Sequence, residues 1–202
     1  MTSLFEDQKK VLKDCTERFE RLRIPYMLSG SMAMLPYAMI RMTRDIDIVV
    51  ELKSGDAQII IDDFGSDYYV PEAGVREAIA NRRMFNMLHT ETIVKIDCIV
   101  RKEDAFQKNA FARRRKTIFS GIDLWIISKE DLILAKLNWA RDTKSEMQMR
   151  DVCSIIRNGY DEEYVQEWSD KLGLDEIMND CKKLLEKNYA DGYDSGDGGV
   201  AE

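Results

Sequence analysis

Histidine is nearly absent from this chain of 202 residues, since His89 is the single example. A metal centre built from several histidines is therefore excluded, and a histidine-based catalytic triad would have to rest on His89 alone. We interpret His89 as a loop residue rather than a general base. The four cysteines lie far apart and form no Cys-x-x-Cys pair, so neither a zinc site nor a disulfide framework is indicated.

Long apolar runs are missing too. No stretch approaches the roughly 20 apolar residues that a membrane-spanning helix needs, and the first ten residues are charged early, without the apolar core of a signal peptide. Hydrophobic residues make up 45% and charged residues 33%, which is ordinary for a soluble globular protein. We expect a cytoplasmic protein that has no membrane partner.

Positive charge is also scarce at one end of the chain. The last twelve residues hold four carboxylates and no Lys or Arg, and the net charge is −7. The rest of the chain is close to balanced, which does not indicate wholesale nucleic-acid binding. Local basic clusters such as 113–116 are interpreted as solvated faces or helix ends.

Apolar periodicity divides the chain into strands that alternate with helices, followed by helices alone. Helices are expected near 3–22, 31–40, 56–64, 72–82, 103–113, 129–141, 146–157, 161–171 and 174–188. Strands are expected at 26–29, 45–50, 68–70, 84–88, 92–100, 116–119 and 123–127. Segments 84–88 and 92–100 would form a hairpin that turns at His89-Thr90, and Pro36 would delay or kink its helix.

This order of elements predicts an α/β (α+β) domain that is followed by a helical C-terminal region. We place the α/β domain at 1–127 and the helical region at 128–190. Residues 191–202 are rich in glycine and acids and poor in apolar side chains, so we expect a disordered acidic tail.

Gly30-Ser31 stands where a predicted strand turns into a predicted helix. Glycine permits unusual dihedral angles and a close approach of the backbone to a ligand. Ser31 adds a hydroxyl beside the free amides of a helix start, which is a natural position for phosphate. The alternative is an ordinary turn followed by a helix cap.

Asp45 and Asp47 are separated by one residue on a predicted strand. Their side chains therefore share one face, with their bases about 7 Å apart. Two such carboxylates repel each other unless a cation lies between them, and Mg²⁺ prefers oxygen ligands. The alternative is a polar strand face exposed to solvent, although Asp is disfavoured in strands.

Asp97 supplies a third carboxylate, on the face of an otherwise apolar strand opposite to Ile96 and Cys98. If this strand lies beside the strand of Asp45, three carboxylates converge. Such a triad can hold two metal ions roughly 3.5–4 Å apart and serve an in-line displacement at phosphorus. A surface acid or a salt-bridge partner is the alternative for Asp97.

Gly30-Ser31, followed by Asp45-x-Asp47 and a later Asp97 on a strand, resembles the polymerase-beta-like nucleotidyltransferase superfamily. Segment 42–48 resembles its bacterial AbiEii-like and related uncharacterised branches, as do segments 130–137 and 150–152. The resemblance extends over about residues 20–155, and the combination of Gly-Ser with Asp-x-Asp is its most specific part.

The resemblance implies a fold in which a small mixed sheet is flanked by helices. It also implies roles for these residues in a transferase that depends on Mg²⁺ or Mn²⁺. Gly30 and Ser31 would bind the triphosphate, and Asp45 and Asp47 would bind two metal ions. Asp97 would complete the metal site and help to activate the acceptor hydroxyl.

Lys136 would meet phosphate by the same resemblance, because family members often carry a basic residue on this helix. The alternative is a lysine on a solvated helix face.

The function implied is transfer of a nucleoside monophosphate from a nucleoside triphosphate, such as ATP, to an acceptor hydroxyl. The acceptor could be transfer RNA, a protein or a small molecule. The AbiEii-like resemblance implies a toxin–antitoxin or phage-defence setting, with a cognate antitoxin as partner. A non-catalytic nucleotide-binding or protein-interaction module with the same fold is the alternative, and the presence of all three carboxylates counts against it.

Overall fold

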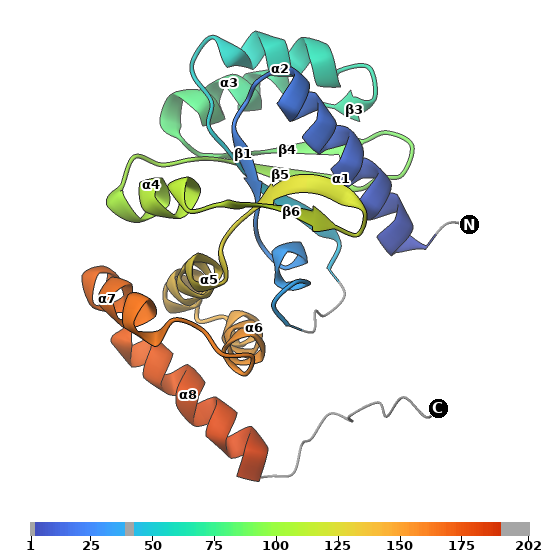
Figure 1. The fold of residues 1–202 in the computed structure, drawn as a ribbon. Helices are drawn as coiled ribbons and strands as arrows, with labels where there is room; N and C mark the ends of the chain where they lie inside the picture. Colours follow the sequence, from blue (N-terminus) through green and yellow to red (C-terminus); the bar gives the residue numbers. More distant parts are fainter. Residues whose placement is uncertain (1–2, 39–42, 191–202) are drawn as a thin grey trace, which may run out of the picture. The chain divides into compact units, whose positions relative to one another are not determined.

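The computed structural model describes residues 3–38 and 43–190 (Figure 1). The chain divides between Leu132 and Ile133 into two compact units, which are described separately. The division lies inside α5 (Lys129–Thr143). The expected tail at 191–202 lies outside the described residues.

The first unit is a mixed sheet flanked by helices. Its strands are β1 (Tyr26–Leu28), β2 (Asp45–Val50), β3 (Tyr68–Tyr69), β4 (Met84–His89), β5 (Lys95–Val100), β6 (Arg115–Phe119) and β7 (Ile122–Ile126). Its complete helices are α1 (Leu4–Arg21), α2 (Asp56–Phe64), α3 (Glu72–Asn81) and α4 (Ala105–Ala112). The strand order is β3-β4-β5-β2-β1-β7-β6, with β2–β5 and β1–β7 parallel and the other pairs antiparallel. The predicted fold class is confirmed.

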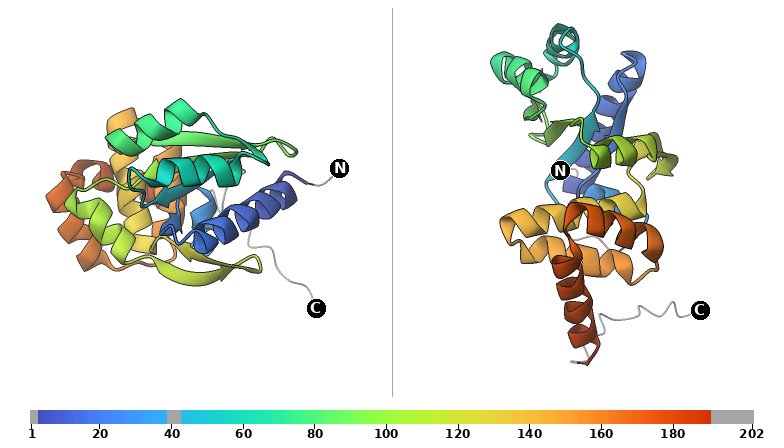
Figure 2. Two further views of the ribbon diagram at one scale, coloured as in Figure 1. Left: turned by 90° about the horizontal axis from the view of Figure 1, so that it is seen from above. Right: turned by 90° about the vertical axis from the view of Figure 1, so that its left-hand side faces the viewer.

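Helices α1 and α2 lie on one face of this sheet (Figures 1 and 2). An aromatic cluster joins them to it. The ring centroid of Phe19 lies 5.7 Å from that of Tyr26 and 5.4 Å from that of Phe64. Tyr26 is the β1 partner of Val50, so it shares a face with Ile48 two residues earlier in β2. The two helices therefore cover the apolar face of β2 and leave the Asp45 face to other contacts.

The expected helix at 31–40 is wrong within the described residues. The structure has only a short 3-10 turn, η1 (Met32–Met34), followed by further turns. Pro36 gives the physical reason, because it lacks an N–H donor and its ring clashes with the carbonyl of Met32 in a regular α-helix. The last two residues of the expected helix lie outside the described residues.

The hairpin of β4 and β5 is confirmed, but the interpretation of His89 as a loop residue is wrong. His89 is the last residue of β4 and only 8% exposed. Its ring lies edge-on to Tyr68 at 5.1 Å, and its Nδ1 accepts a hydrogen bond from the backbone N–H of Thr92 at 3.2 Å. These contacts give His89 a structural role at the end of the strand.

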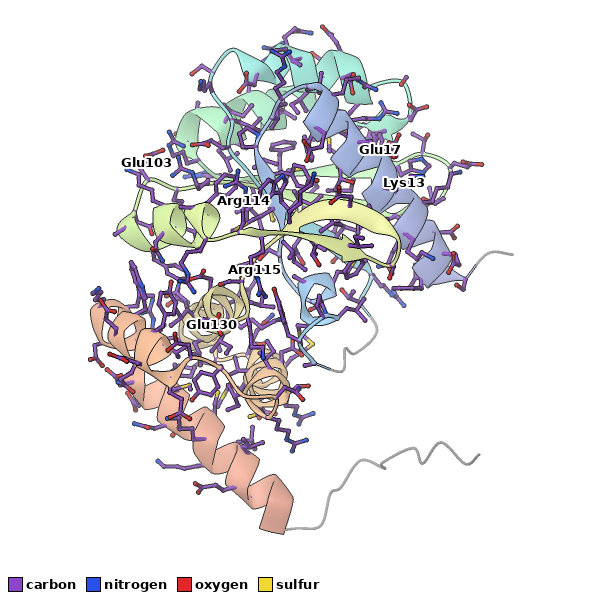
Figure 3. The ribbon with its side chains drawn as sticks, in the orientation of Figure 1. Lys13, Glu17, Glu103, Arg114, Arg115 and Glu130 are labelled. Carbon is purple, nitrogen blue, oxygen red and sulfur yellow. The ribbon has the colours of Figure 1, made fainter. Side chains whose placement is uncertain are left out.

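The basic cluster 113–116 lies at the end of α4 and the start of β6, which agrees with its interpretation as a helix end (Figure 3). The guanidinium of Arg114 lies over the Trp125 ring at 4.9 Å. Arg115 donates a hydrogen bond of 2.9 Å to the hydroxyl of Tyr37. Internal contacts of this kind engage part of the cluster within its own unit.

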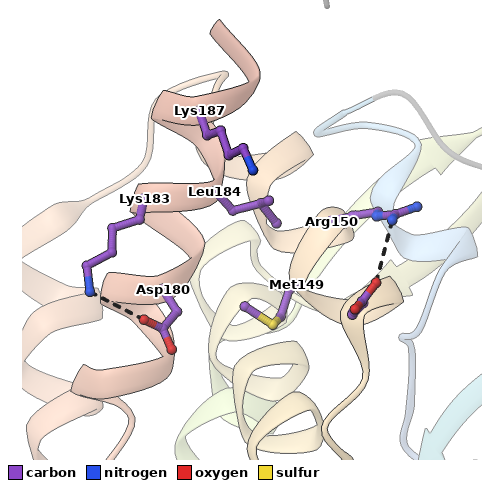
Figure 4. Close-up of a pocket in the computed structure, with 7 residues that line it drawn as sticks. Met149, Arg150, Asp180, Lys183, Leu184 and Lys187 are labelled. Carbon is purple, nitrogen blue, oxygen red and sulfur yellow. Dashed lines mark ion pairs between the residues drawn. The ribbon is translucent and has the colours of Figure 1, made fainter. Parts of the chain in front are cut away.

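The second unit is helical, as expected, and contains the end of α5 together with α6 (Glu146–Ile156), α7 (Glu162–Leu172) and α8 (Asp175–Ala190). A pocket of about 440 Å³ lies between α6 and α8 (Figure 4). It is lined by Met149 and Leu184 and by two ion pairs, Lys183–Asp180 (3.5 Å) and Arg150–Glu146 (3.6 Å).

Across both described stretches of the chain, every helix falls short of the length and apolar character that a membrane crossing requires.

Replacing Phe19 by alanine should cost about 3–5 kcal/mol of unfolding free energy, because it empties a fully buried site between two rings. Phe5, on the same helix, is 38% exposed, and Phe5→Ala should change stability by no more than about 0.5 kcal/mol. Denaturant-induced unfolding of both variants measures the difference. Equal losses would show that the cluster does not anchor α1.

Candidate active site

The end of β1 is tied to β2 at Asp47. The backbone N–H of Ser29 donates to the carbonyl of Asp47 at 2.8 Å, and Gly30 follows with φ of +62°. A Cβ atom added to Gly30 would lie 1.9 Å from Oδ2 of Asp47 and 2.7 Å from its Cβ. The carboxylate of Asp47 thus packs directly against this glycine, and any side chain at position 30 would displace it.

Ser31 follows immediately and is only 5% exposed. It precedes the short 3-10 turn instead of the expected helix. Ser31 therefore does not lie beside the amides of a regular helix start. Its role as a phosphate ligand stays a prediction, which rests on its position after Gly30.

The parallel pairing of β2 with β5 sets the acids opposite one another. Asp47 is the register partner of Asp97, and Asp45 is the partner of Lys95. Partners in adjacent strands project from the same face of a sheet. Asp45, Asp47 and Asp97 therefore share one face, opposite to the face that α1 and α2 cover. Strands β2 and β5 are therefore adjacent, as the expected triad requires.

Lys95 lies between two of these acids. Its Nζ is 3.3 Å from Oδ2 of Asp45 and 3.0 Å from Oδ2 of Asp97. Burial lowers the pKa of Lys95, but its hydrogen bonds and ion pairs with Asp97 and Asp45 outweigh that effect, so the net pKa is raised. The lysine is therefore cationic at neutral pH. Sequence reasoning missed Lys95, although the Lys-x-Asp spacing on one strand already places both side chains on one face.

The donor set suits a hard cation. Asp97 is 7% exposed, and its Oδ1 is buried without a hydrogen-bond partner among the residues that the structure describes. A buried acceptor without a partner is costly, and carboxylate oxygens are the ligands that Mg²⁺ prefers. No ready-made cluster of three or more His, Cys, Asp or Glu side chains exists in the described part of the chain. A metal ion would therefore require the side chains to rearrange around it.

Lys136 belongs to the second unit and does not have the solvated position of the alternative interpretation. Its side chain is 4% exposed, and its Nζ lies 2.7 Å from Oδ2 of Asp151 and 3.0 Å from Oε1 of Gln148. That alternative is wrong. Contact between Lys136 and phosphate stays a prediction, and it would require the ammonium to give up part of a buried ion pair.

Solved structures share this architecture at low sequence identity. An antigenic nucleotidyltransferase-like protein from Paracoccidioides brasiliensis is 14% identical, with a TM-score of 0.52 over 87% of this chain and 91% of that chain. ANT(2")-Ia, solved in complex with adenylyl-2"-tobramycin, is 12% identical, with a TM-score of 0.52 over 91% of this chain and 99% of that chain. These likenesses show a nucleotidyltransferase fold. No curated protein matches the sequence.

The sequence itself identifies the family. The model of the family described as "Nucleotidyltransferase of unknown function (DUF6036)" matches residues 1–157, and the chain belongs to this family. The predicted membership of the nucleotidyltransferases is confirmed. The AbiEii-like branch stays a prediction.

Gly30→Ala should weaken metal-dependent triphosphate binding at least about tenfold, because the new Cβ would push the Asp47 carboxylate aside. Gly173→Ala is the matched control, since Gly173 has φ of +65° and no atom within 4 Å of the added Cβ. Both variants should lose about 1–2 kcal/mol of stability through backbone strain, but only Gly30→Ala should lose binding in a calorimetric titration. Equal binding by the two variants would show that triphosphate binding does not depend on the close packing of Gly30 and Asp47.

Lys136→Met should reduce the unfolding free energy by about 3–5 kcal/mol, because it removes the ammonium that lies 2.7 Å from the buried carboxylate of Asp151. The double variant Lys136→Met/Asp151→Leu should recover most of that loss. Chemical denaturation of the two variants tests this expectation. If the single variant is as stable as the wild type, the pair of Lys136 and Asp151 does not support the fold.

Proposed function

We propose that the protein is a Mg²⁺- or Mn²⁺-dependent nucleotidyltransferase that moves a nucleoside monophosphate from a nucleoside triphosphate to an acceptor hydroxyl. The observation that carries this proposal is the register of β2 and β5, which sets Asp47 opposite Asp97 with Asp45 on the same face. Membership of a nucleotidyltransferase family supports the same class of reaction.

Asp45, Asp47 and Asp97 are the residues that would hold the metal. When bound, Mg²⁺ would neutralise charge on the triphosphate. Gly30 lets the carboxylate of Asp47 lie against the backbone, which fixes its position for this task. Ser31 would add a hydroxyl donor to the triphosphate beside that glycine.

The transfer itself needs no covalent intermediate on the protein. The oxygen of the acceptor forms a bond to the α-phosphorus, and the bond from that phosphorus to the bridging oxygen of pyrophosphate breaks. The proton of the acceptor hydroxyl would pass to Asp97, whose buried Oδ1 has no hydrogen-bond partner within the described ranges. The protein would contribute position and electrostatics, which is how most phosphoryl-transfer enzymes act.

The acceptor is proposed as RNA, a protein or a small molecule. The fold shared with ANT(2")-Ia, which was solved with an adenylylated tobramycin, makes antibiotics a useful small-molecule set to test. A toxin–antitoxin or defence role with a cognate antitoxin remains part of the proposal, because it follows from the AbiEii-like resemblance of the sequence motifs.

The decisive experiment incubates the protein with each triphosphate, labelled at the α-phosphate, together with Mg²⁺ and cell extract. RNA, protein and small molecules are then separated, and the label should appear in one fraction. The α-phosphate must carry the label, because a γ-label would leave with pyrophosphate. Failure of all four triphosphates to label any fraction would contradict the proposed transfer.

Asp45→Asn/Asp47→Asn should abolish metal-dependent triphosphate binding, and Asp97→Asn should lower turnover by about 10²–10⁴-fold through loss of the proton acceptor. Asp123→Asn is the control, because Asp123 is an exposed carboxylate on strand β7. Calorimetry measures binding, and transfer of the α-label measures turnover. Unchanged binding in the double variant would refute the metal site.

A further inference from the structure

We propose that Lys95 is a built-in counter-cation of this site, whose ammonium holds Asp45 and Asp97 together until a divalent ion displaces it. The inference deepens the proposed function and rests on it, because it concerns the same carboxylates. It assigns a positioning role to a residue that the sequence motif does not include.

The need for a cation follows from the strand pairing. Asp45 and Asp47 lie on β2, next to Asp97 on β5, and all three project from one face of the sheet. Like charges on neighbouring strands destabilise their pairing. The lysine also comes from β5, directly opposite Asp45, so the register that gathers the acids delivers the cation as well.

The position of the ammonium puts it in competition with metal. It contacts Oδ2 of Asp45 at 3.3 Å and Oδ2 of Asp97 at 3.0 Å, so it spans two strands as a bridging ion would. A divalent ion held between these two oxygens would lie next to a positive charge, and the two cations repel strongly at that distance. Metal binding therefore requires the ammonium to leave.

The lysine is free enough to leave. Its side chain is 35% exposed, whereas that of Asp97 is 10% exposed. A lysine ammonium is a compact charge on a flexible four-carbon stem, so it can move into solvent without a change of backbone. Asp97 would stay in place and exchange one cation for another.

Lys95 therefore has two opposite effects, one on the stability of the fold and one on the affinity for metal. Without metal, Lys95 stabilises the fold by offsetting repulsion among the acids. When metal binds, Lys95 loses its ion pairs with Asp45 and Asp97, and this loss makes the free energy of metal binding less favourable. The lysine therefore weakens metal affinity. A lysine with a merely structural role would produce the first effect without the second.

The test is a titration with Mn²⁺ alone, without nucleotide, in which the electron paramagnetic resonance signal reports free Mn²⁺. Lys95→Met should bind Mn²⁺ about two- to thirtyfold more tightly than the wild type, which corresponds to the loss of two partly exposed ion pairs as competitors. Lys95→Arg keeps the charge and should bind close to the wild-type value. Lys116→Met is the matched control, because Lys116 also lies on a strand and pairs with a carboxylate, Asp123, at 3.2 Å.

Thermal unfolding gives the second readout. In the presence of a chelator, Lys95→Met should melt below the wild type, and added Mn²⁺ should narrow or reverse the difference. Lys116→Met should show no such dependence on metal. Unchanged or weaker Mn²⁺ affinity in Lys95→Met would overturn the proposal, and so would a lack of Mn²⁺ binding by both that variant and the wild type.

The two proposals fail separately. If nucleotide transfer is never observed but Lys95→Met binds Mn²⁺ more tightly, the exchange of cations stands and the transferase activity does not. If transfer occurs and Mn²⁺ affinity is the same in both proteins, only the role of Lys95 is lost.

Discussion

The parallel pairing of β2 with β5 determines which charged groups meet. A slip of one residue in a sheet turns every side chain of a strand to the other face, so a one-residue slip of β5 from the observed register would move Asp97 away from the face of Asp45 and Asp47. Burial keeps that register in place, since Ile46 and Ile48 pair with Ile96 and Cys98 beneath the helices, and all four are fully buried. The apolar core of the first unit thus specifies the arrangement of its polar site.

Backbone geometry adds a second constraint from β1. The positive φ of Gly30 turns the chain where the preceding residue is hydrogen-bonded to the carbonyl of Asp47. Because the Asp47 carboxylate fills the space where a side chain at position 30 would lie, the glycine and the acid are structurally one unit. Their separation along the sequence reflects only the length of the connection between two adjacent antiparallel strands.

The alternation of residue types along the sequence was sufficient to predict which side chains share a face of a strand. It was insufficient to predict which strands lie side by side. Alternation alone placed Asp45 and Asp47 together, because that relation is local. The position of Asp97 beside them depends on a strand order that is not sequential, and only the family resemblance implied it. The helix predicted at 31–40 is absent because Pro36 outweighs the helical spacing of the apolar residues. The role of Lys95 is not evident from one strand of the sequence, because it depends on acids from two strands, β2 and β5.

Exposure separates the two lysine–carboxylate sites of this chain. Lys136 and Asp151 are 4% and 6% exposed, and breaking such a pair leaves an uncompensated buried charge at a cost of about 3–5 kcal/mol. The side chain of Lys95 is 35% exposed, so its ion pairs with Asp45 (43% exposed) and Asp97 (10% exposed) each keep one partner in contact with solvent, a setting in which an ion pair contributes about 0.2–1 kcal/mol. Binding of a divalent ion can offset a loss of about 0.2–1 kcal/mol for each ion pair, but it does not readily offset a loss of about 3–5 kcal/mol. The pair of Lys136 and Asp151 is therefore a fixed contact between α5 and α6. The ammonium of Lys95, in contrast, is an exchangeable cation between β2 and β5.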